Sequence, residues 1–138
     1  MEKDKYCVFT DGAARGNPGP ASWAYVLMKN DKVLYEGKGV LGKTTNNVAE
    51  YTAIIKALEN ANDYGIGSID VVSDSQLAIN QLNRVWKVKK EHLRPLFARV
   101  MAMVERFEAV NFIHSPRGTK MIQRADMLAN QALDEAGL

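Results

Sequence analysis

Four acidic residues of this chain each lie inside a distinctive local phrase. The phrases are FTDGAARGNPGP with Asp11, TTNNVAEYTAI with Glu50, VVSDSQLAI with Asp74 and QRADMLANQAL with Asp126. Carboxylates that are brought together repel one another and raise each other's pKa, so a cation is needed to keep such a cluster ionised. Oxygen ligands of this kind suit Mg²⁺. Two such ions would activate a water on one side of a phosphodiester and stabilise the leaving oxygen on the other.

Each acid also has a structural interpretation of its own. Asp11 precedes a glycine, which is a common turn pair, and Asn47 and Glu50 have the spacing of a capping box. Asp74 could cap a following helix, and Asp126 falls in the first turns of a predicted helix, where negative charge suits the helix dipole. Taken singly, the acids favour these roles, so the metal hypothesis depends on whether the fold gathers them.

The elements that must position these acids can be predicted from the pattern of apolar residues. Short apolar runs predict five strands, at 5–11, 22–28, 32–40, 68–74 and 109–114. Apolar residues that recur every three or four positions predict helices over about 48–58, 93–107 and 125–133, and a short helix over 75–82. The order predicts an α/β fold with a five-stranded mixed sheet, its first three strands antiparallel, flanked by helices.

This order gives the acids a common location. Asp11 ends the first predicted strand and Asp74 ends the fourth. If these strands are parallel neighbours, both carboxylates emerge at the same carboxyl edge, where open α/β sheets place their ligands. Glu50 and Asp126 would then project toward that edge from helices on the faces of the sheet.

Composition favours one domain spanning residues 1–138, with 46% hydrophobic residues and a net charge of +2. The single cysteine, Cys7, cannot form an internal disulfide and is predicted to be a small buried apolar residue. Neither a signal peptide nor a membrane-spanning run is evident, so the expected location is cytoplasmic. A basic stretch surrounds Trp86, and it is interpreted either as a solvated face or as a contact for a polyanion; its cations are Arg84, Lys87, Lys89, Lys90, Arg94 and Arg99.

Taken together, the four phrases resemble those of ribonuclease H, type 1, over about residues 6–133. The specific parts are DG-x-x-x-GNPGP and TNN-x-x-E. The resemblance implies a ribonuclease H-like fold and endonucleolytic cleavage of the RNA strand of an RNA/DNA hybrid, leaving 5′-phosphate and 3′-hydroxyl ends. It implies two Mg²⁺ ions with substrate, or Mn²⁺ as a substitute. No obligatory protein partner is evident in the sequence, so a monomer is expected. The resemblance assigns catalysis and metal binding to Asp11, Glu50, Asp74 and Asp126.

The resemblance also assigns substrate contacts. The residues that match readers of the RNA 2′-hydroxyl are Gly12 and Ala14 through the backbone, and Asn17 and Gln76 through side chains; this hydroxyl is what distinguishes RNA from DNA. The residues that match the DNA-strand and phosphate contacts are Thr45, Asn46 and Asn47. Plain turn chemistry is the alternative for Asn17, and helix capping is the alternative for the 45–47 stretch.

Two departures from the family pattern stand out. A long basic handle of many bacterial relatives is missing, and only NRVWKVKKEHLRPL fills its place. Trp86, Lys87 and Lys89, with Lys90, are therefore interpreted as a reduced substitute; the alternative is weaker, more salt-sensitive binding of the hybrid. Where bacterial relatives carry a histidine in a mobile loop, this chain has Pro116, so His114 or Arg117 is the candidate to assist turnover.

Other classes of function use the same fold. A non-catalytic nucleic-acid-binding module would gain nothing from four negative charges facing phosphates. A transposase, integrase or junction-resolving core is disfavoured by the GNPG and TNN phrases, and a reverse transcriptase fragment by the compact length.

Overall fold

The computed structural model describes residues 3–116 and 119–138. Within them, the elements follow the predicted order, with one added 3₁₀ turn, η1. The strands are β1 (Tyr6–Ala14), β2 (Gly19–Lys29), β3 (Lys32–Thr44), β4 (Ser68–Ser73) and β5 (Ala109–His114). The helices are α1 (Asn46–Asp63), α2 (Gln76–Leu82), η1 (Glu91–Leu93), α3 (Arg94–Val104) and α4 (Lys120–Glu135).

The strands form one five-stranded mixed sheet in the order β3-β2-β1-β4-β5. Strands β1, β2 and β3 pair antiparallel because short connections join them, and β4 and β5 add in parallel because a helix precedes each. The predicted fold class is therefore confirmed, including the antiparallel first three strands.

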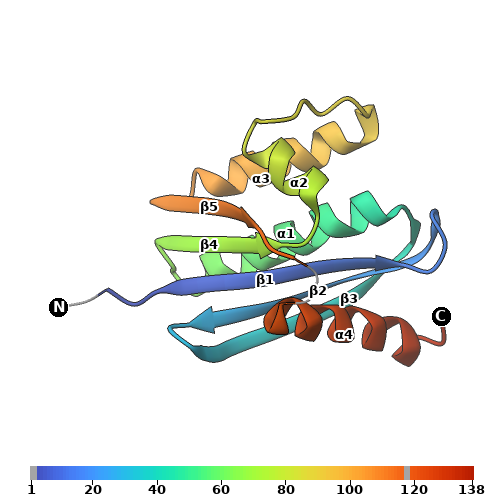
Figure 1. The fold of residues 1–138 in the computed structure, drawn as a ribbon, viewed down its shortest axis with the longest axis horizontal. Helices are drawn as coiled ribbons and strands as arrows, with labels where there is room; N and C mark the ends of the chain where they lie inside the picture. Colours follow the sequence, from blue (N-terminus) through green and yellow to red (C-terminus); the bar gives the residue numbers. More distant parts are fainter. Residues whose placement is uncertain (1–2, 117–118) are drawn as a thin grey trace.

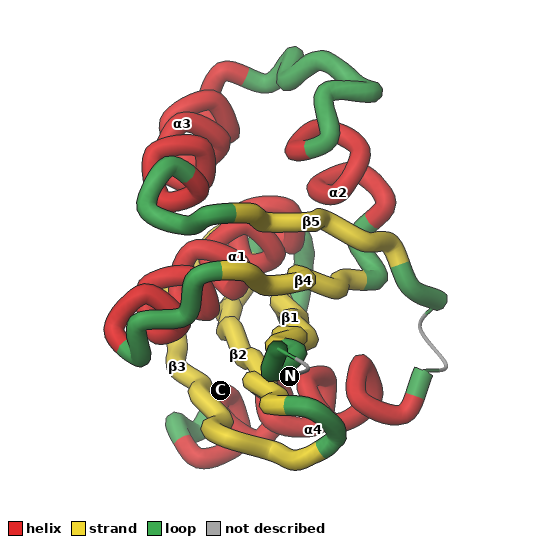
Figure 2. Tube along the Cα trace, turned by 90° about the vertical axis from the view of Figure 1, so that its left-hand side faces the viewer, coloured by secondary structure: helices red, strands yellow, loops and turns green. Residues whose placement is uncertain are grey.

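Helices cover both faces of the sheet, as Figures 1 and 2 show. Strand β2 alternates between two cores, with Tyr25 and Leu27 in the larger cluster and Ala24 and Val26 in the smaller one. The larger core lies between the sheet and α1, and α3 packs against α1. The smaller core lies under α4, on the opposite face.

Because its apolar contact is small, α4 is also held by polar contacts to distant strands. The buried hydroxyl of Ser22 on β2 donates to the carbonyl of Ala129 at 2.6 Å. The guanidinium of Arg124 donates twice to the carboxylate of Glu36 on β3, at 2.7 and 2.8 Å. These contacts fix the helix that carries Asp126.

Several predicted boundaries were wrong. Strand β1 does not end at Asp11 but continues to Ala14, because this part still has β2 as a partner. Because of the same hairpin pairing, β2 begins at Gly19, earlier than the predicted start at residue 22. Strand β3 runs on to Thr44, beyond the predicted end at residue 40. Helix α4 begins at Lys120, which places Asp126 in its second turn. Cys7 is half-buried rather than fully buried.

None of the helices among the described residues is both long and apolar enough to cross a membrane.

Candidate active site

The site forms where β4 stops and its neighbour β1 continues. The parallel pairing of these strands ends at Thr10 and Ser73. Asp11 directly follows the last paired residue of β1, and Asp74 directly follows that of β4. The predicted meeting of these two acids at one sheet edge is confirmed. Beyond this point, the side of β1 that β4 has left is open to another partner.

Glu50 of α1 occupies that opening. Its Oε1 accepts a hydrogen bond from the backbone N–H of Gly12 at 3.0 Å. A Cβ at Gly12 would lie 2.4 Å from both the carbonyl carbon of Ala49 and the nitrogen of Glu50, closer than any side chain allows. Only glycine therefore permits α1 to approach β1 closely enough for Glu50 to stand beside Asp11.

The proposed capping roles of two acids were wrong. Thr45 caps α1, with its hydroxyl accepting from the N–H of Val48 at 3.3 Å, so Glu50 does not close a capping box with Asn47. The cap of α2 is Ser75, whose hydroxyl accepts from the N–H of Ala78 at 3.2 Å, and not Asp74.

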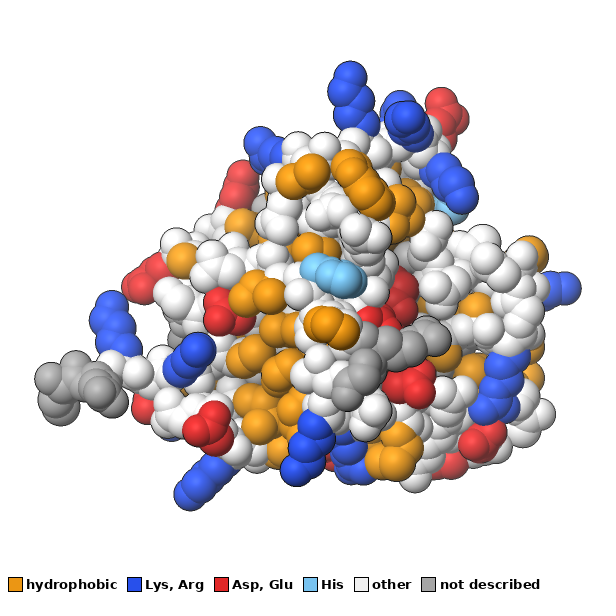
Figure 3. Space-filling view, viewed as in Figure 1, with side chains coloured by type: hydrophobic (Ala, Val, Ile, Leu, Met, Phe, Trp, Pro, Cys, Tyr) orange, Lys and Arg blue, Asp and Glu red, His pale blue; other side chains and the backbone are white. Residues whose placement is uncertain are grey.

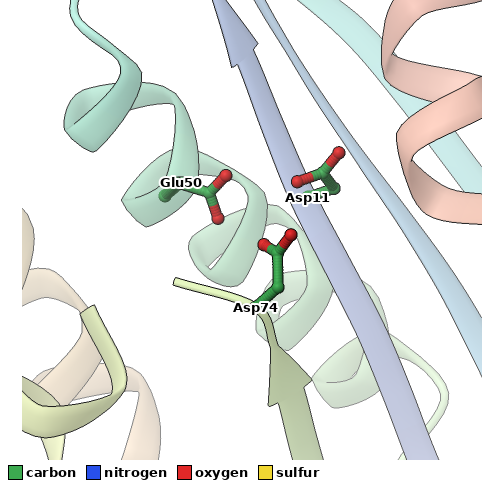
Figure 4. Close-up of side chains that lie close together, drawn as sticks. All are labelled: Asp11, Glu50 and Asp74. Atoms are coloured by element: carbon green, nitrogen blue, oxygen red, sulfur yellow. The ribbon is translucent and has the colours of Figure 1, made fainter. Parts of the chain in front are cut away.

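All four predicted acids come together at this edge. Carboxylate oxygens of Asp11, Glu50 and Asp74, one from each residue, lie within 4.8 Å of one another (Figure 4). Asp126, which is exposed on α4, lies near enough to this group for its carboxylate to raise the pKa of Asp11. Each acid therefore comes from a different element. Asp11 lies on β1 and Asp74 at the end of β4, while Glu50 and Asp126 come from helices on opposite faces of the sheet.

Burial makes this cluster electrostatically expensive to ionise. Asp11 is 2% exposed and Glu50 is 3% exposed. Burial, followed by the charge of Glu50 and the contact with Asp126, raises the pKa of Asp11 well above its usual value. Burial also raises the pKa of Glu50, as does the charge of Asp74, while the N–H of Gly12 acts in the opposite direction.

The donor set fits a hard divalent cation. All the ligand atoms are carboxylate oxygens, which suit Mg²⁺ and Mn²⁺ rather than softer metals. A cation among them would offset both the mutual repulsion and the cost of burial.

Two residues that contact the acids were missed in the sequence. The buried hydroxyl of Ser73 donates to Oε2 of Glu50 at 3.4 Å and accepts from the N–H of Ser75 at 3.0 Å. The side-chain amide of Asn130 donates to the carbonyl of Asp126 at 3.0 Å and to its Oδ1 at 3.4 Å. The sequence offered one signal for each residue. Ser73 is adjacent to Asp74, and Asn130 lies one helical turn after Asp126.

A groove of about 570 Å³ gathers predicted substrate residues from separate segments. It is lined by Asn47 from α1, Leu77 and Gln81 from α2, and by Val85, Trp86, Lys87, Lys89, Lys90 and Leu93 from the connection to α3. Gln81 holds this connection in place, because its amide reaches the carbonyl of Lys87 at 3.5 Å while its oxygen accepts from the hydroxyl of Tyr51 at 2.6 Å. Lysine and arginine side chains project from this end of the molecule (Figure 3).

The remaining predicted residues surround the acids or lie apart. Oδ1 of Asn17 accepts from the N–H of Asn46 at 3.0 Å, which joins the GNPG loop to the start of α1. Ala14 ends β1, and Gln76 is the exposed first residue of α2. His114 is exposed at the end of β5, and Arg117 lies outside the described residues.

Comparisons with known proteins agree with this geometry. A family model described as reverse transcriptase-like matches residues 9–132. The chain is 43% identical over 129 residues to ribonuclease HI of Halobacterium salinarum, covering 93% of this chain and 64% of that protein. It is 39% identical to a bifunctional protein of Mycobacterium tuberculosis, covering 96% of this chain and 36% of that protein. The chain therefore spans less than two thirds of either relative.

Solved structures are similar over nearly the whole chain. The crystal structure of ribonuclease H1 from H. salinarum has a TM-score of 0.91 at 42% identity, covering 95% of this chain and 98% of that one. The crystal structure of LC11-RNase H1 in complex with an RNA/DNA hybrid also has a TM-score of 0.91, at 38% identity, covering 97% of this chain and 100% of that one.

Proposed function

This chain belongs to the ribonuclease H family, and we propose that residues 1–138 form one catalytic domain that hydrolyses the RNA strand of RNA/DNA hybrids. The observation that carries the proposal is the close approach of Asp11, Glu50 and Asp74, within 4.8 Å, with Asp126 on α4 near enough to raise the pKa of Asp11. The solved complex of LC11-RNase H1 contains such a hybrid, which supports the same substrate here.

In this proposal, the four acids hold two divalent ions, Mg²⁺ or Mn²⁺, when the substrate is bound. Such ions would activate the attacking water and stabilise the oxygen that leaves the phosphodiester, giving 5′-phosphate and 3′-hydroxyl ends. The chain itself supplies position. Glu50 is held at one oxygen by Gly12 and at the other by Ser73, and Asp126 is held by Asn130. All these groups come from one chain, so the proposed site needs no second subunit.

Recognition of RNA is proposed to occur beside the acids. A residue in a strand points its N–H and its C=O to the same side. The N–H of Gly12 donates to Glu50, so the carbonyl of Gly12 also faces the open edge of β1. The side-chain oxygen of Asn17 accepts from the N–H of Asn46 on α1, which leaves the amide hydrogens of Asn17 to donate to a 2′-hydroxyl. Ala14 and Gln76 complete the proposed set of readers.

The groove is proposed to hold the DNA strand. Lysine side chains suit phosphates, and Trp86, which is 43% exposed, offers a face for stacking. Asn47 lines the groove, and Thr45 and Asn46 lie next to it at the start of α1. Helix α2 ends at Leu82 and α3 begins at Arg94, so the segment between them has room only for a short substitute for a handle.

Turnover is proposed to be assisted by His114, at the end of β5, or by Arg117. Comparing kcat for His114→Ala and Arg117→Ala identifies which one acts. Unchanged kcat in both variants would exclude both residues from the mechanism.

The test of the proposed function is cleavage of labelled substrates by the purified chain in Mg²⁺ and in Mn²⁺, with duplex RNA and duplex DNA beside the hybrid. We expect RNA fragments with 5′-phosphate ends from the hybrid alone. Binding of the hybrid without cleavage in either metal would instead support a binding module. Cleavage of duplex DNA would support an integrase-like activity.

A further inference from the structure

Ser73 is the last residue of β4, and its side chain is fully buried. It directly precedes Asp74 in the chain, and its hydroxyl contacts Glu50 of α1. Each of its polar groups that faces the site has a partner. Its hydroxyl accepts from the N–H of Ser75 and donates to Glu50, at 3.0 and 3.4 Å. Its carbonyl accepts from the N–H of Ser115 at 2.9 Å, just beyond β5.

The first of these contacts shapes the turn around Asp74. A serine hydroxyl that accepts from the N–H two residues later closes a small turn with the intervening residue at its centre. That residue is Asp74, so the turn determines where its side chain leaves the backbone. The cap of α2 is supplied by Ser75, and the carboxylate of Asp74 is directed toward Asp11 and Glu50 (Figure 4).

The second contact fixes the carboxylate of Glu50. One oxygen of this group accepts from Gly12 and the other accepts from Ser73. With one donor on each oxygen, rotation of the carboxylate would break a hydrogen bond in a site from which water is largely excluded. Each oxygen still keeps lone-pair capacity for a cation.

We propose, as an extension of the function above, that Ser73 is a positioning residue that sets the mutual geometry of Glu50 and Asp74 as metal ligands. It acts through its hydroxyl, which joins the β4–α2 turn to α1. Groups that orient metal ligands in this way commonly change metal affinity by about 10- to 100-fold when they are removed.

The test is calorimetric titration of Mg²⁺ and Mn²⁺ into the substrate-free chain, for wild type, Ser73→Ala and Ser73→Thr. We expect Ser73→Ala to bind either ion roughly tenfold more weakly, and Ser73→Thr, which restores a hydroxyl, to bind more tightly than Ser73→Ala. For hybrid cleavage, Ser73→Ala should lower kcat at fixed metal concentration with little change in KM, because the groove is intact.

Thr52→Val is the matched control. The hydroxyl of Thr52, which is partly buried on α1, donates one hydrogen bond within its own helix, to the carbonyl of Val48 at 2.8 Å, and does not contact Glu50 or Asp74. The variant loses a hydroxyl without loosening one element from another, so it should keep the metal affinity of wild type. If Ser73→Ala does not fold, Ser73→Cys replaces it, since the thiol has a similar shape and donates weakly.

The outcomes separate the two proposals. If wild type binds metal and cleaves hybrid while the Ser73 variants bind metal within about twofold of it, the positioning role is refuted and the proposed function stands. Equal weakening in Thr52→Val, or no recovery in Ser73→Thr, would also refute the role. Failure of wild type to bind metal or cleave hybrid would overturn both.

Discussion

Replacement of Asp74 by asparagine should stabilise the metal-free chain while abolishing its catalysis. Asp74 raises the pKa of both Asp11 and Glu50 through its charge, so it contributes to the repulsion within the cluster. Asparagine keeps the shape of the side chain and removes the charge. A group that destabilises the fold while serving the reaction indicates a functional site rather than a structural one.

The size of the effect follows from the distances. Two unit charges 4.8 Å apart, the outer limit for these carboxylate oxygens, repel by about 3.5 kcal/mol at an effective dielectric constant of about 20. The raised pKa values keep part of the cluster protonated near neutral pH, so only part of this repulsion is present. We expect the free energy of unfolding of Asp74→Asn to exceed that of wild type by about 1–3 kcal/mol.

The assay is urea denaturation of both chains, in chelator and then in Mg²⁺, at about pH 8. Mg²⁺ at about a hundred times its dissociation constant adds roughly 2.7 kcal/mol to a chain that binds it, so the advantage of the variant should close or reverse in favour of wild type. Cleavage of hybrid should fall by at least about a hundredfold in the variant, the scale of losing one electrostatic group at a transition state.

Asp70→Asn is the matched control on the same strand. Its Oδ1 accepts from the amide of Asn111 at 3.0 Å, away from the cluster. This change should leave cleavage unaltered and add no stability in chelator. The reasoning would be refuted if Asp74→Asn were less stable than wild type without metal, or if it cleaved hybrid as fast.

Three further outcomes are expected. Because the folded pKa values of Asp11 and Glu50 are raised, their contribution to stability is fully present below the ordinary carboxyl pKa of about 4 and is lost as pH rises through the folded values. Urea denaturation in chelator should therefore show stability falling between about pH 5 and pH 9, with Mg²⁺ reducing the slope; a flat profile in chelator would contradict this. Gly12→Ala should cost about 1–3 kcal/mol or more in denaturation and weaken metal binding, since its Cβ would lie 2.4 Å from backbone atoms of α1 that cannot yield; wild-type metal affinity would show that the close approach is unnecessary. Alanine at Lys87, Lys89 and Lys90 together should raise KM for hybrid and reduce the salt slope of binding by roughly two to three, and an unchanged slope across a salt series would mean that these lysines form only a solvated face.

Much of the site could be predicted because its signals are local. Apolar periodicity located every strand and helix in order, and the four phrases identified the acids that the structure gathers. The predicted parallel pairing of β1 with β4 then placed Asp11 and Asp74 together. Boundaries were less predictable, because a strand continues as long as a partner is present, as β1 does beyond Asp11.

Helix caps show where local patterns mislead. The spacing of Asn47 and Glu50 fits a capping box, yet β3 runs to Thr44 and α1 starts at Asn46, so Thr45 is the only residue between them and becomes the cap. A cap is decided by where the chain leaves the preceding element, and pairing with a distant strand sets that point.

The sequence by itself determined which residues are the candidates for the chemistry, the order of the elements and the family, because these depend on residue types and short spacings. Only the tertiary structure decided how the acids meet. Glu50 reaches Asp11 because Gly12 lets α1 approach β1, and Asp126 reaches it because contacts of α4 with β2 and β3 dock that helix on the opposite face. These contacts join segments far apart in the chain, so no local pattern encodes them.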